Sequence, residues 1–274
     1  DLPRGKPEQV GLSSERLERI TGLMQRYVDD EKLLGVSTMI ARNGRVVYHE
    51  TTGMLDFDTG APLRDDSLFR IYSMTKPIVT VAAMMLYEEG RFQLDAPISR
   101  YIPELADLQV LVDGELVPAD HQPTVREVMT HTAGFTYGVF GNTAVDQQYR
   151  QAQILRNGNL DEMVERLGEI PLQYQPGTRW HYSVSVDVIG ALIERLAGLP
   201  LDVFLRERMF EPLGMTDTFF EVPADKRHRF GTNHVIDAET GKLKVNEGDR
   251  DRFTQRVTFF SGGFVGSVGS AGLR

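Results

Sequence analysis

The sequence predicts an α/β layer with a mainly helical region inserted in it, a fold class of the α/β plus α type. Two apolar runs flank Asn43-Gly44 and predict a β-hairpin early in the chain, because Asn-Gly is the strongest two-residue hairpin signal. The segment "HVIDAETGKLKVN" predicts a second hairpin late in the chain. Between the hairpins, apolar residues recur mainly at helical spacing, so helices separate two groups of strands.

Most of the predicted helices have recognisable ends. The first, "SSERLERITGLMQRYVDD", carries apolar residues at helical spacing and can be capped by Ser13 or Ser14. The second covers 73–89 and ends at a glycine. "TVREVMTH" is the third, because Thr124 and Glu127 form a capping box. Helical patterns also cover 160–168, 185–198 and 201–209.

The composition excludes several classes of function. The chain has no cysteine, which excludes disulfides and thiol catalysis. Its formal net charge of -9 argues against nucleic acid or an anionic membrane surface as a partner. The apolar run "PIVTVAAMML", about ten residues, is too short to span a bilayer. We expect no nucleic-acid and no membrane partner, and a cytoplasmic location with the periplasm as the alternative.

The stretch "FRIYSMTKPIV", residues 69–79, admits two interpretations of Ser73. In the first, Ser73 caps an ordinary helix, which is the commonest role of a serine at a helix start. In the second, Ser73 is a nucleophile whose proton is taken by Lys76. The S-x-x-K pattern is short, and a chain of this composition contains it by chance with a frequency of about one in four. The pattern alone therefore does not decide between them.

The surroundings of the pattern favour the catalytic interpretation. Residues three apart lie on one face of a helix, so the Lys76 amine can reach the Ser73 hydroxyl. Pro77 suits a first helical turn, and the N-terminal end of a helix stabilises negative charge near the serine oxygen. Lys76 must be neutral to act as a base, and burial beside apolar residues such as Met74 and Ile78 is expected to favour the neutral amine.

A serine–lysine pair usually needs a third group to move protons. The best candidate is Tyr182 in "PGTRWHYSVSVDVIGALIERLAG", which follows a Pro-Gly turn and precedes a predicted helix. The alternative is a buried aromatic ring at a helix start, and the residues by themselves favour that alternative.

Four segments, in this order along the chain, carry a resemblance to a known family. They are "FRIYSMTKPIV", "VMTHTAGFTYG", "YQPGTRWHYSVSVDVIGALIE" and "FLRERMFEPLGMTDTFF". With them the chain resembles the serine β-lactamase and penicillin-binding-protein superfamily, and it is most similar to class C β-lactamases and family VIII carboxylesterases. The resemblance implies a β-lactamase-like fold, in which helices flank an antiparallel sheet and a helical domain is inserted. The α/β domain is then expected at 1–72 and 183–274 and the helical domain at 73–182, with the active site at their junction.

The resemblance also implies a mechanism. Ser73 attacks a carbonyl carbon and forms an acyl-enzyme, while Lys76 and Tyr182 together move the proton, and which of the two is the base stays open. The backbone N–H of Ser73 is expected to form half of an oxyanion hole. No cofactor and no metal are expected. The residues expected to line the substrate pocket are Tyr137, Val139 and Val184.

One departure from the family concerns the substrate. Class C β-lactamases carry Tyr-x-Asn at the second motif, whereas this chain has Tyr182-Ser183-Val184. Valine cannot donate a hydrogen bond to the amide of a β-lactam, so the departure favours an esterase that cleaves small carboxylic esters. The alternatives are a β-lactamase or D-alanyl-D-alanine peptidase, and a non-catalytic relative that binds acyl ligands.

A second departure concerns the third family motif, Lys-Thr-Gly or a His-x-Gly or Trp-x-Gly variant, whose strand supplies the second oxyanion donor. The sequence contains no such triplet, and Asp58-Thr59-Gly60 and Glu239-Thr240-Gly241 are predicted turns. "SGGFVGSVGSAGL" resembles the stretch before a further helix in relatives. We therefore expect the last part of the sheet to be absent from this chain, and a C-terminal fragment of the same protein to complete the fold.

The histidines are not expected to take part in catalysis. The superfamily uses no base at the position of His131 in "THTAGF", so His131 is predicted to brace its loop. His121, His181 and His228 have no partners at metal-ligand spacing.

Overall fold

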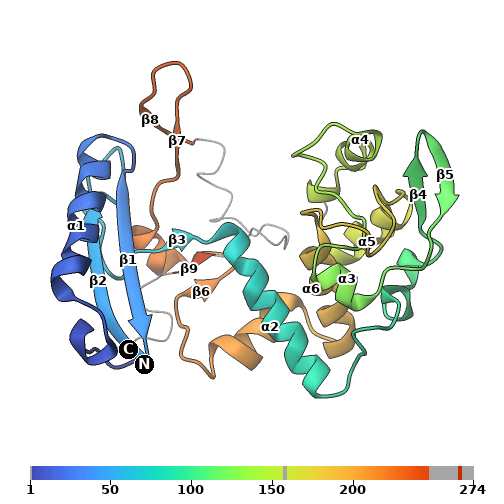
Figure 1. The fold of residues 1–274 in the computed structure, drawn as a ribbon, viewed down its shortest axis with the longest axis horizontal. Coiled ribbons are helices and arrows are strands. Elements are labelled where there is room, and N and C mark those ends of the chain that lie inside the picture. The colour runs from blue at the N-terminus through green and yellow to red at the C-terminus, as the bar shows by residue number, and fades with distance from the viewer. Residues whose placement is uncertain (1, 157–158, 247–264, 267–274) are drawn as a thin grey trace. The chain divides into compact units, whose positions relative to one another are not determined.

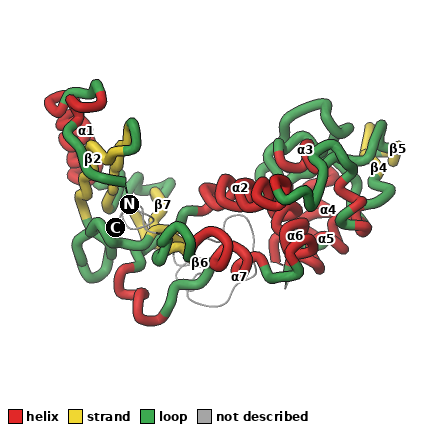
Figure 2. Tube along the Cα trace, turned by 90° about the horizontal axis from the view of Figure 1, so that it is seen from below, coloured by secondary structure: helices red, strands yellow, loops and turns green. Residues whose placement is uncertain are grey.

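The computed structural model describes residues 2–156, 159–246 and 265–266. These residues divide into two compact units, each of which is described by itself. The first unit consists of 2–71, 210–246 and 265–266 and contains both predicted hairpins. The second unit consists of the described residues of 72–209 and is mainly helical. Figure 1 shows both units with their elements labelled apart from α7, which is labelled in Figure 2.

The elements have the following bounds. The helices are α1 (Ser14–Asp29), α2 (Thr75–Glu88), α3 (Val125–Met129), α4 (Ala144–Gln151), α5 (Leu160–Gly168), α6 (Ser185–Ala197) and α7 (Leu201–Leu205). The strands are β1 (Gly35–Arg42), β2 (Arg45–Gly53), β3 (Phe69–Arg70), β4 (Gln109–Val112), β5 (Glu115–Pro118), β6 (Thr218–Phe219), β7 (His234–Ile236), β8 (Leu243–Val245) and β9 (Val265–Gly266).

The early hairpin of the first unit is confirmed. Strands β1 and β2 pair antiparallel along their whole length. Asn43 and Gly44 join them with φ values of 50° and 70°, the left-handed backbone that a type I′ turn requires. Helix α1 lies along this ribbon (Figure 1). Of the two predicted caps, Ser13 and Ser14, the structure uses Ser13, whose Oγ accepts a hydrogen bond from the Arg16 N–H at 3.3 Å.

The other strands of the first unit are short. Strands β7 and β8 form the predicted second hairpin. Strands β3, β9 and β6 form a three-stranded antiparallel sheet with β9 in the centre. Each of these three strands is only two residues long, so the described residues form several small sheets and not the single continuous sheet expected from the resemblance.

Helix α6 is the centre of the second unit. Every residue from Ser185 to Ile193 is buried, so the helix is covered on all sides. Helices α2, α3, α5 and α7 pack against it, and Figure 2 shows α2, α5 and α6 grouped in this part of the chain. Although α6 is apolar, no helix among the described residues combines the length and the apolar character needed to cross a membrane.

This packing places residues 183–209 in the helical unit, whereas the predicted boundary assigned them to the α/β domain. The predicted boundary followed the position of the motifs along the chain. The structure groups residues by contact, and α6 buries its apolar surface against α2, α3 and α5. The helix that follows Tyr182 is therefore part of the same compact unit as the helix that follows Ser73.

The other helix predictions match closely. The pattern over 160–168 is α5, and the pattern over 185–198 is α6. The segment 201–209 is divided between α7 and a wider π-type turn. The capping box at the start of α3 is formed, because the Thr124 N–H donates to Glu127 Oε2 at 2.8 Å and the Glu127 N–H donates to Thr124 Oγ1 at 3.2 Å.

The second unit also contains a hairpin that we did not predict. Strands β4 and β5 pair antiparallel across Asp113-Gly114, whose φ values are 52° and 89°. The sequence carried the signal, because Asp-Gly lies between two short apolar runs in "LQVLVDGELVP". Helix α4 was also missed, and it begins with a capping box of Thr143 and Asp146.

The turn that follows α3 depends on Gly134. Its φ is +91°, and a Cβ at this position would lie 2.2 Å from the carbonyl oxygen of Tyr174. The Gly134 carbonyl oxygen also accepts a hydrogen bond from the Gln173 N–H at 2.8 Å. The two backbones are therefore in direct contact, and only glycine fits between them.

We expect Gly134→Ala to lower the free energy of unfolding by about 3 kcal/mol or more, because a clash is added to left-handed backbone strain. Gly198→Ala is the matched control, since Gly198 has a φ of +68° and an added Cβ there would have nothing within 4 Å. We expect Gly198→Ala to lower the free energy of unfolding by only about 1 kcal/mol. Urea unfolding followed by circular dichroism measures both changes, and equal losses would show that the contact with Tyr174 is unimportant.

Candidate active site

Ser73 does not cap the helix that follows it. Tyr72–Met74 form a short turn, and Met74 occupies the N-cap position of α2 without a side-chain hydrogen bond. The Ser73 Oγ lies 2.5 Å from Tyr182 Oη and accepts a hydrogen bond from Lys76 Nζ at 3.3 Å. The interpretation of Ser73 as a helix cap is therefore wrong. The structure brings the three residues predicted to be catalytic into contact within the second unit.

The backbone just before Ser73 is strained. Tyr72 has a φ of +41°, in the left-handed region that bulky side chains rarely adopt. Such a conformation costs about 1–3 kcal/mol, persists only where the surrounding structure holds it, and is concentrated at functional sites. Ser73 itself is exposed, so a ligand can approach its hydroxyl.

Lys76 is buried, with 7% of its surface exposed. Its Nζ lies 4.8 Å from the centroid of the Tyr182 ring and 5.5 Å from the centroid of the Tyr137 ring. Aromatic rings thus cover the amine, whereas Met74, which was expected to cover it, is 64% exposed. The local sequence could not reveal this, because both rings come from segments far from α2 along the chain.

The Tyr182 ring belongs to a group of aromatic rings. Tyr137 stacks on it with the centroids 5.4 Å apart and the planes 19° apart, and Trp180 stacks at 6.1 Å and 23°. The imidazole of His131 lies 5.0 Å from the same ring. These neighbours restrict the orientation of the phenol, whose Oη contacts Ser73. We did not predict Trp180, although residues two apart in extended chain lie on the same face.

Large apolar side chains beside this group are exposed. The exposed fractions are 76% for Phe140, 64% for Trp180 and 54% for Val139. The Phe140 ring lies 5.4 Å from the Tyr137 ring. An exposed apolar surface of this kind suits the apolar part of a ligand.

Val184 does not contribute to this surface, although it was predicted to line the pocket. Its side chain is completely buried, and its N–H donates to the Thr136 carbonyl oxygen at 3.3 Å. The difference arises because Val184 lies at the N-cap of α6, the most buried helix of the unit.

A seam of hydrogen bonds attaches the Tyr182 segment to the turn after α3. We call its two sides the 131–136 turn and the 173–184 segment. The backbone N–H groups donate from Gln173 to Gly134 O (2.8 Å), from Gly177 to Thr132 O (2.8 Å), from His181 to His131 O (2.8 Å) and from Val184 to Thr136 O (3.3 Å). The Ser183 N–H donates to His131 Nδ1 at 3.3 Å. The backbone is thus held on both sides of Tyr182, while the phenol contacts Ser73.

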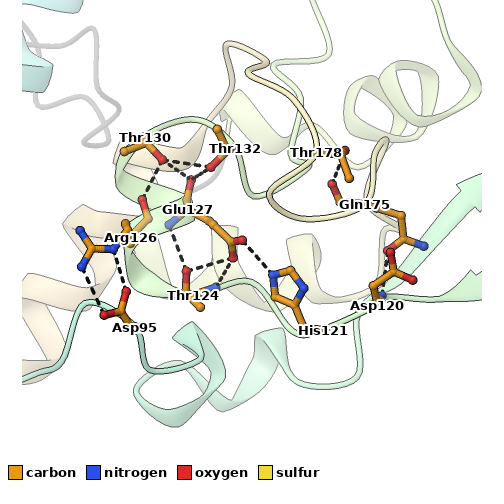
Figure 3. A network of polar contacts seen from close by, with 10 residues as sticks. All are labelled: Asp95, Asp120, His121, Thr124, Arg126, Glu127, Thr130, Thr132, Gln175 and Thr178. Carbon is orange, nitrogen blue, oxygen red and sulfur yellow. Dashed lines mark hydrogen bonds and ion pairs between the residues drawn. The ribbon is translucent and has the colours of Figure 1, made fainter.

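Figure 3 shows the polar network that fixes the start of the 131–136 turn, with Glu127 at its centre. The Glu127 carboxylate accepts a hydrogen bond from the Thr124 N–H and lies 2.8 Å from His121 Nε2. The hydroxyl groups that donate to the Glu127 carbonyl oxygen are those of Thr130 and Thr132. The end of α3 and the beginning of the turn are therefore held by the same residue.

The 173–184 segment is anchored in the same network (Figure 3). The side chain of Gln175 accepts a hydrogen bond from the Asp120 N–H at 2.8 Å and donates to the Pro118 carbonyl oxygen at 3.2 Å. The Thr178 hydroxyl donates to the Gln175 carbonyl oxygen at 2.7 Å. The Pro-Gly turn that leads to Tyr182 is therefore fixed to the end of β5 and the loop after it.

A buried carboxylate supports the far end of the seam. Asp146 accepts hydrogen bonds from Thr136 Oγ1 at 2.6 Å and from the Thr143 N–H at 2.9 Å. Burial acts to raise the pKa of Asp146, but these hydrogen bonds outweigh it and lower the pKa. Thr136 Oγ1 also lies 3.3 Å from His181 Nε2, so the residue before Tyr182 contacts this buried group.

Burial keeps His131 neutral at ordinary pH. Desolvation, followed by the charges of Lys76 and His181, lowers the pKa of His131 to about 4. Its Nδ1 faces the Ser183 N–H, which can only donate, so Nδ1 must be the acceptor and the ring proton belongs on Nε2. This contact to the Tyr182 segment is the bracing role that the sequence predicts for His131.

The other candidate groups that the sequence raised lie in turns or outside the described residues. Among the residues that the structure describes, no three His, Cys, Asp or Glu side chains are placed to hold a metal ion. Both Thr-Gly triplets lie in turns, where the N–H groups of Thr59 and Thr240 donate to Asp56 and Asp237 at 2.8 and 2.9 Å. The segment "SGGFVGSVGSAGL" lies outside the described residues apart from Val265–Gly266.

We expect His131→Asn to make folding less sensitive to acid. The pKa of His131 is about 4 in the folded protein, below the usual value of 6.5 that applies to the unfolded chain. Because the folded-state pKa is lowered, the contribution of His131 to stability is fully present above pH 6.5 and is lost as the pH falls towards 4. Between pH 7.5 and pH 5 the free energy of unfolding of the wild type should fall by on the order of 1 kcal/mol more than that of the variant. Urea midpoints at the two pH values check this, and equal losses would contradict it.

Comparison with known proteins supports the family that the four motifs suggested. The Beta-lactamase family model matches residues 20–274. Esterase EstB of Burkholderia gladioli is 35% identical over 205 residues, which are 74% of this chain and 51% of EstB. The lovastatin esterase of Penicillium rubens is 32% identical over 206 residues, which are 72% of this chain and 51% of that enzyme.

The fold also matches solved structures. EstCE1, described as a hydrolase with promiscuous acyltransferase activity, superimposes with a TM-score of 0.80 at 27% identity, over 93% of this chain and 70% of EstCE1. The fold is therefore β-lactamase-like, as the resemblance implied. The chain spans about half the length of the curated relatives that it matches. Because the family model covers nearly all of the sequence, this chain belongs to the β-lactamase family.

Proposed function

We propose that this protein is a serine hydrolase that cleaves small carboxylic esters through an acyl-enzyme on Ser73. The observation that carries the proposal is the position of the Ser73 Oγ, 2.5 Å from Tyr182 Oη and 3.3 Å from Lys76 Nζ. The names of two relatives, esterase EstB and lovastatin esterase, support an ester as the substrate class.

In the first half-reaction the Ser73 Oγ attacks the ester carbonyl carbon, and its proton passes to the pair formed by Tyr182 and Lys76. The carbonyl oxygen becomes an oxyanion, for which the Ser73 N–H is the proposed donor. The bond between carbon and the alcohol oxygen then breaks, and the alcohol leaves with the proton. The acyl group remains on Ser73 as an ester.

In the second half-reaction a water molecule replaces the alcohol. The same pair takes a proton from the water as its oxygen attacks the acyl carbon. The bond to the Ser73 oxygen breaks, and that oxygen takes the proton back. One ester and one water have then become an acid and an alcohol, and Tyr182 and Lys76 have returned to their starting protonation states.

We propose that the apolar part of the substrate lies on the exposed aromatic surface. Tyr137 contributes the ring stacked on Tyr182, and Val139 and Phe140 extend the surface into solvent. This proposal keeps Tyr137 and Val139 in the substrate pocket and assigns no contact to Val184, which is buried.

A second candidate function is transfer of the acyl group to an alcohol in place of water. The description of EstCE1 as a hydrolase with promiscuous acyltransferase activity favours it. The two functions share the acyl-enzyme and differ only in the acceptor of the second half-reaction. Product analysis with added 1-butanol separates them, because transfer yields a butyl ester and hydrolysis yields the acid.

We also propose that a C-terminal part of the same protein supplies the second oxyanion donor and completes the sheet. The sequence contains no Lys-Thr-Gly triplet, and the chain spans about half the length of EstB. Intact mass spectrometry of the active protein tests this. A single fully active species with the mass of these 274 residues would contradict the proposal.

A fluorophosphonate probe tests the nucleophile in the full-length protein that contains this chain. We expect one covalent adduct on the wild type and none on Ser73→Ala, because the probe reacts only with an activated serine. Ser99→Ala, a serine of the same unit outside the site, is the control and should label like the wild type. Labelling of Ser73→Ala at the wild-type rate would place the nucleophile elsewhere.

Turnover of p-nitrophenyl butyrate tests the proton-transfer group. We expect Tyr182→Phe to lower kcat by about 10²- to 10⁴-fold with a smaller change in KM, because the ring remains but the hydroxyl that takes part in proton transfer is removed. The rate of nitrocefin turnover, measured in parallel, distinguishes an esterase from a β-lactamase. Turnover of nitrocefin as fast as that of the ester would favour a β-lactamase over an esterase.

A further inference from the structure

We infer that His131 is a positioning residue that holds the backbone on both sides of Tyr182 and thereby keeps the Tyr182 phenol at Ser73. The expected effect on catalysis rests on the proposed function. The hydrogen bonds by which His131 holds the Tyr182 segment do not depend on that function. Within the described part of the chain the carbonyl oxygen and Nδ1 of His131 bond to the neighbours of Tyr182, while the His131 N–H donates to the Val128 carbonyl oxygen at 3.3 Å. The Ser73 hydroxyl and the Lys76 amine bond to other groups.

Three contacts form the clamp. The His131 carbonyl oxygen accepts the His181 N–H at 2.8 Å, and its Nδ1 accepts the Ser183 N–H at 3.3 Å. The Ser183 hydroxyl lies 3.2 Å from the same nitrogen. One residue therefore fixes both neighbours of Tyr182, one through its backbone and one through its side chain.

The imidazole also packs against the ring that it positions. Its centroid lies 5.0 Å from the Tyr182 ring and 6.1 Å from the Trp180 ring, so it contacts both members of that stacked pair. His131 has a φ of +58°, an uncommon backbone that Asn, Asp and His adopt more readily than other residues. The position thus combines a left-handed backbone with an acceptor on a short side chain, and few residue types supply both.

The acceptor nitrogen needs a neutral ring. A proton on Nδ1 would turn two N–H groups towards each other and break the contact with Ser183. The charged or titratable groups that act on the ring are Lys76 and His181, and with burial they keep the pKa of His131 low. The clamp is therefore intact at the neutral pH where an ester hydrolase is assayed.

The rest of the seam holds the ends of the segment independently. The Val184 N–H is bound by the Thr136 carbonyl oxygen, and the Thr136 hydroxyl is fixed by the buried Asp146. Removing the His131 side chain should therefore release Ser183 and Tyr182 without unfolding the segment. This separation makes the inference testable with a folded protein.

Two substitutions distinguish the role of the acceptor nitrogen from the role of the left-handed backbone at position 131. His131→Asn keeps a left-handed backbone and places an amide oxygen near the position of Nδ1, so it should still accept the Ser183 N–H. His131→Gly also allows the backbone but offers no acceptor. His228→Asn is the control, because His228 is an exposed histidine of the first unit.

Hydrogen exchange gives a readout that does not depend on activity. We expect the Ser183 amide of His131→Gly to exchange at least about tenfold faster than in the wild type, and that of His131→Asn to stay within about threefold. Mass spectrometry of peptides that cover 180–186, in the full-length protein at pH 7, measures this. Unchanged exchange in His131→Gly would overturn the clamp.

Kinetics with p-nitrophenyl butyrate tests the effect of the clamp on catalysis. Misplacement of a reacting group by about 1 Å can cost about 100-fold, so we expect kcat of His131→Gly to fall about 10- to 100-fold with KM changed less than about threefold. His131→Asn should recover most of the loss, and His228→Asn should match the wild type. Equal kcat values for the glycine and asparagine variants would show that the acceptor has no role in positioning.

Different results would contradict the esterase proposal and the clamp. If the wild type neither reacts with the fluorophosphonate nor turns over the ester, the esterase proposal fails. Faster exchange in His131→Gly would in that case still support the clamp. If the wild type is active and exchange and kcat are both unchanged in His131→Gly, the clamp is wrong and the esterase proposal stands.

Discussion

The hydrogen-bonded seam between the 131–136 turn and the 173–184 segment is the constraint on which the site depends. Ser73 lies in the short turn directly before α2 and Lys76 in the first turn of that helix, so their spacing is fixed by local geometry. Tyr182 lies in irregular chain before α6, so no helix fixes its backbone, and the neighbour within its own segment that stacks on its ring is Trp180. Five backbone N–H groups of the 173–184 segment donate to the 131–136 turn, four to carbonyl oxygens and one to His131 Nδ1, and these bonds fix the position of Tyr182.

The seam in turn depends on features that surround it. Glu127 joins the end of α3 to the beginning of the turn, and Gly134 lets the two backbones touch. Asp146 fixes Thr136 at the other end. These three residues lie outside the reacting groups, yet each supports one part of the turn that positions Tyr182. Satisfied hydrogen bonds of this kind are the condition under which buried polar groups specify a structure.

The surroundings of Lys76 are aromatic. Buried lysines are usually paired with a carboxylate, but among the described residues the Lys76 amine bonds to the Ser73 hydroxyl. Its neighbours are the hydroxyl of Ser73 and the rings of Tyr137 and Tyr182. Within the residues that the structure describes, the amine donates to the serine oxygen and to no carboxylate. The same rings border the exposed apolar surface, so one aromatic group serves both the reacting atoms and the proposed substrate site.

Features that depend on residues close together in the chain could be predicted from the sequence. Asn43-Gly44 specifies the first hairpin, the pair Thr124 and Glu127 specifies the start of α3, and S-x-x-K spacing places Lys76 beside Ser73. Tyr182 lies 109 residues from Ser73, and only the four ordered motifs pointed to it. The tertiary structure alone decided that Val184 is buried, that aromatic rings cover Lys76 and that α6 belongs to the helical unit. The physical reason is that such contacts join segments distant in the chain, so packing selects them and no local spacing records them.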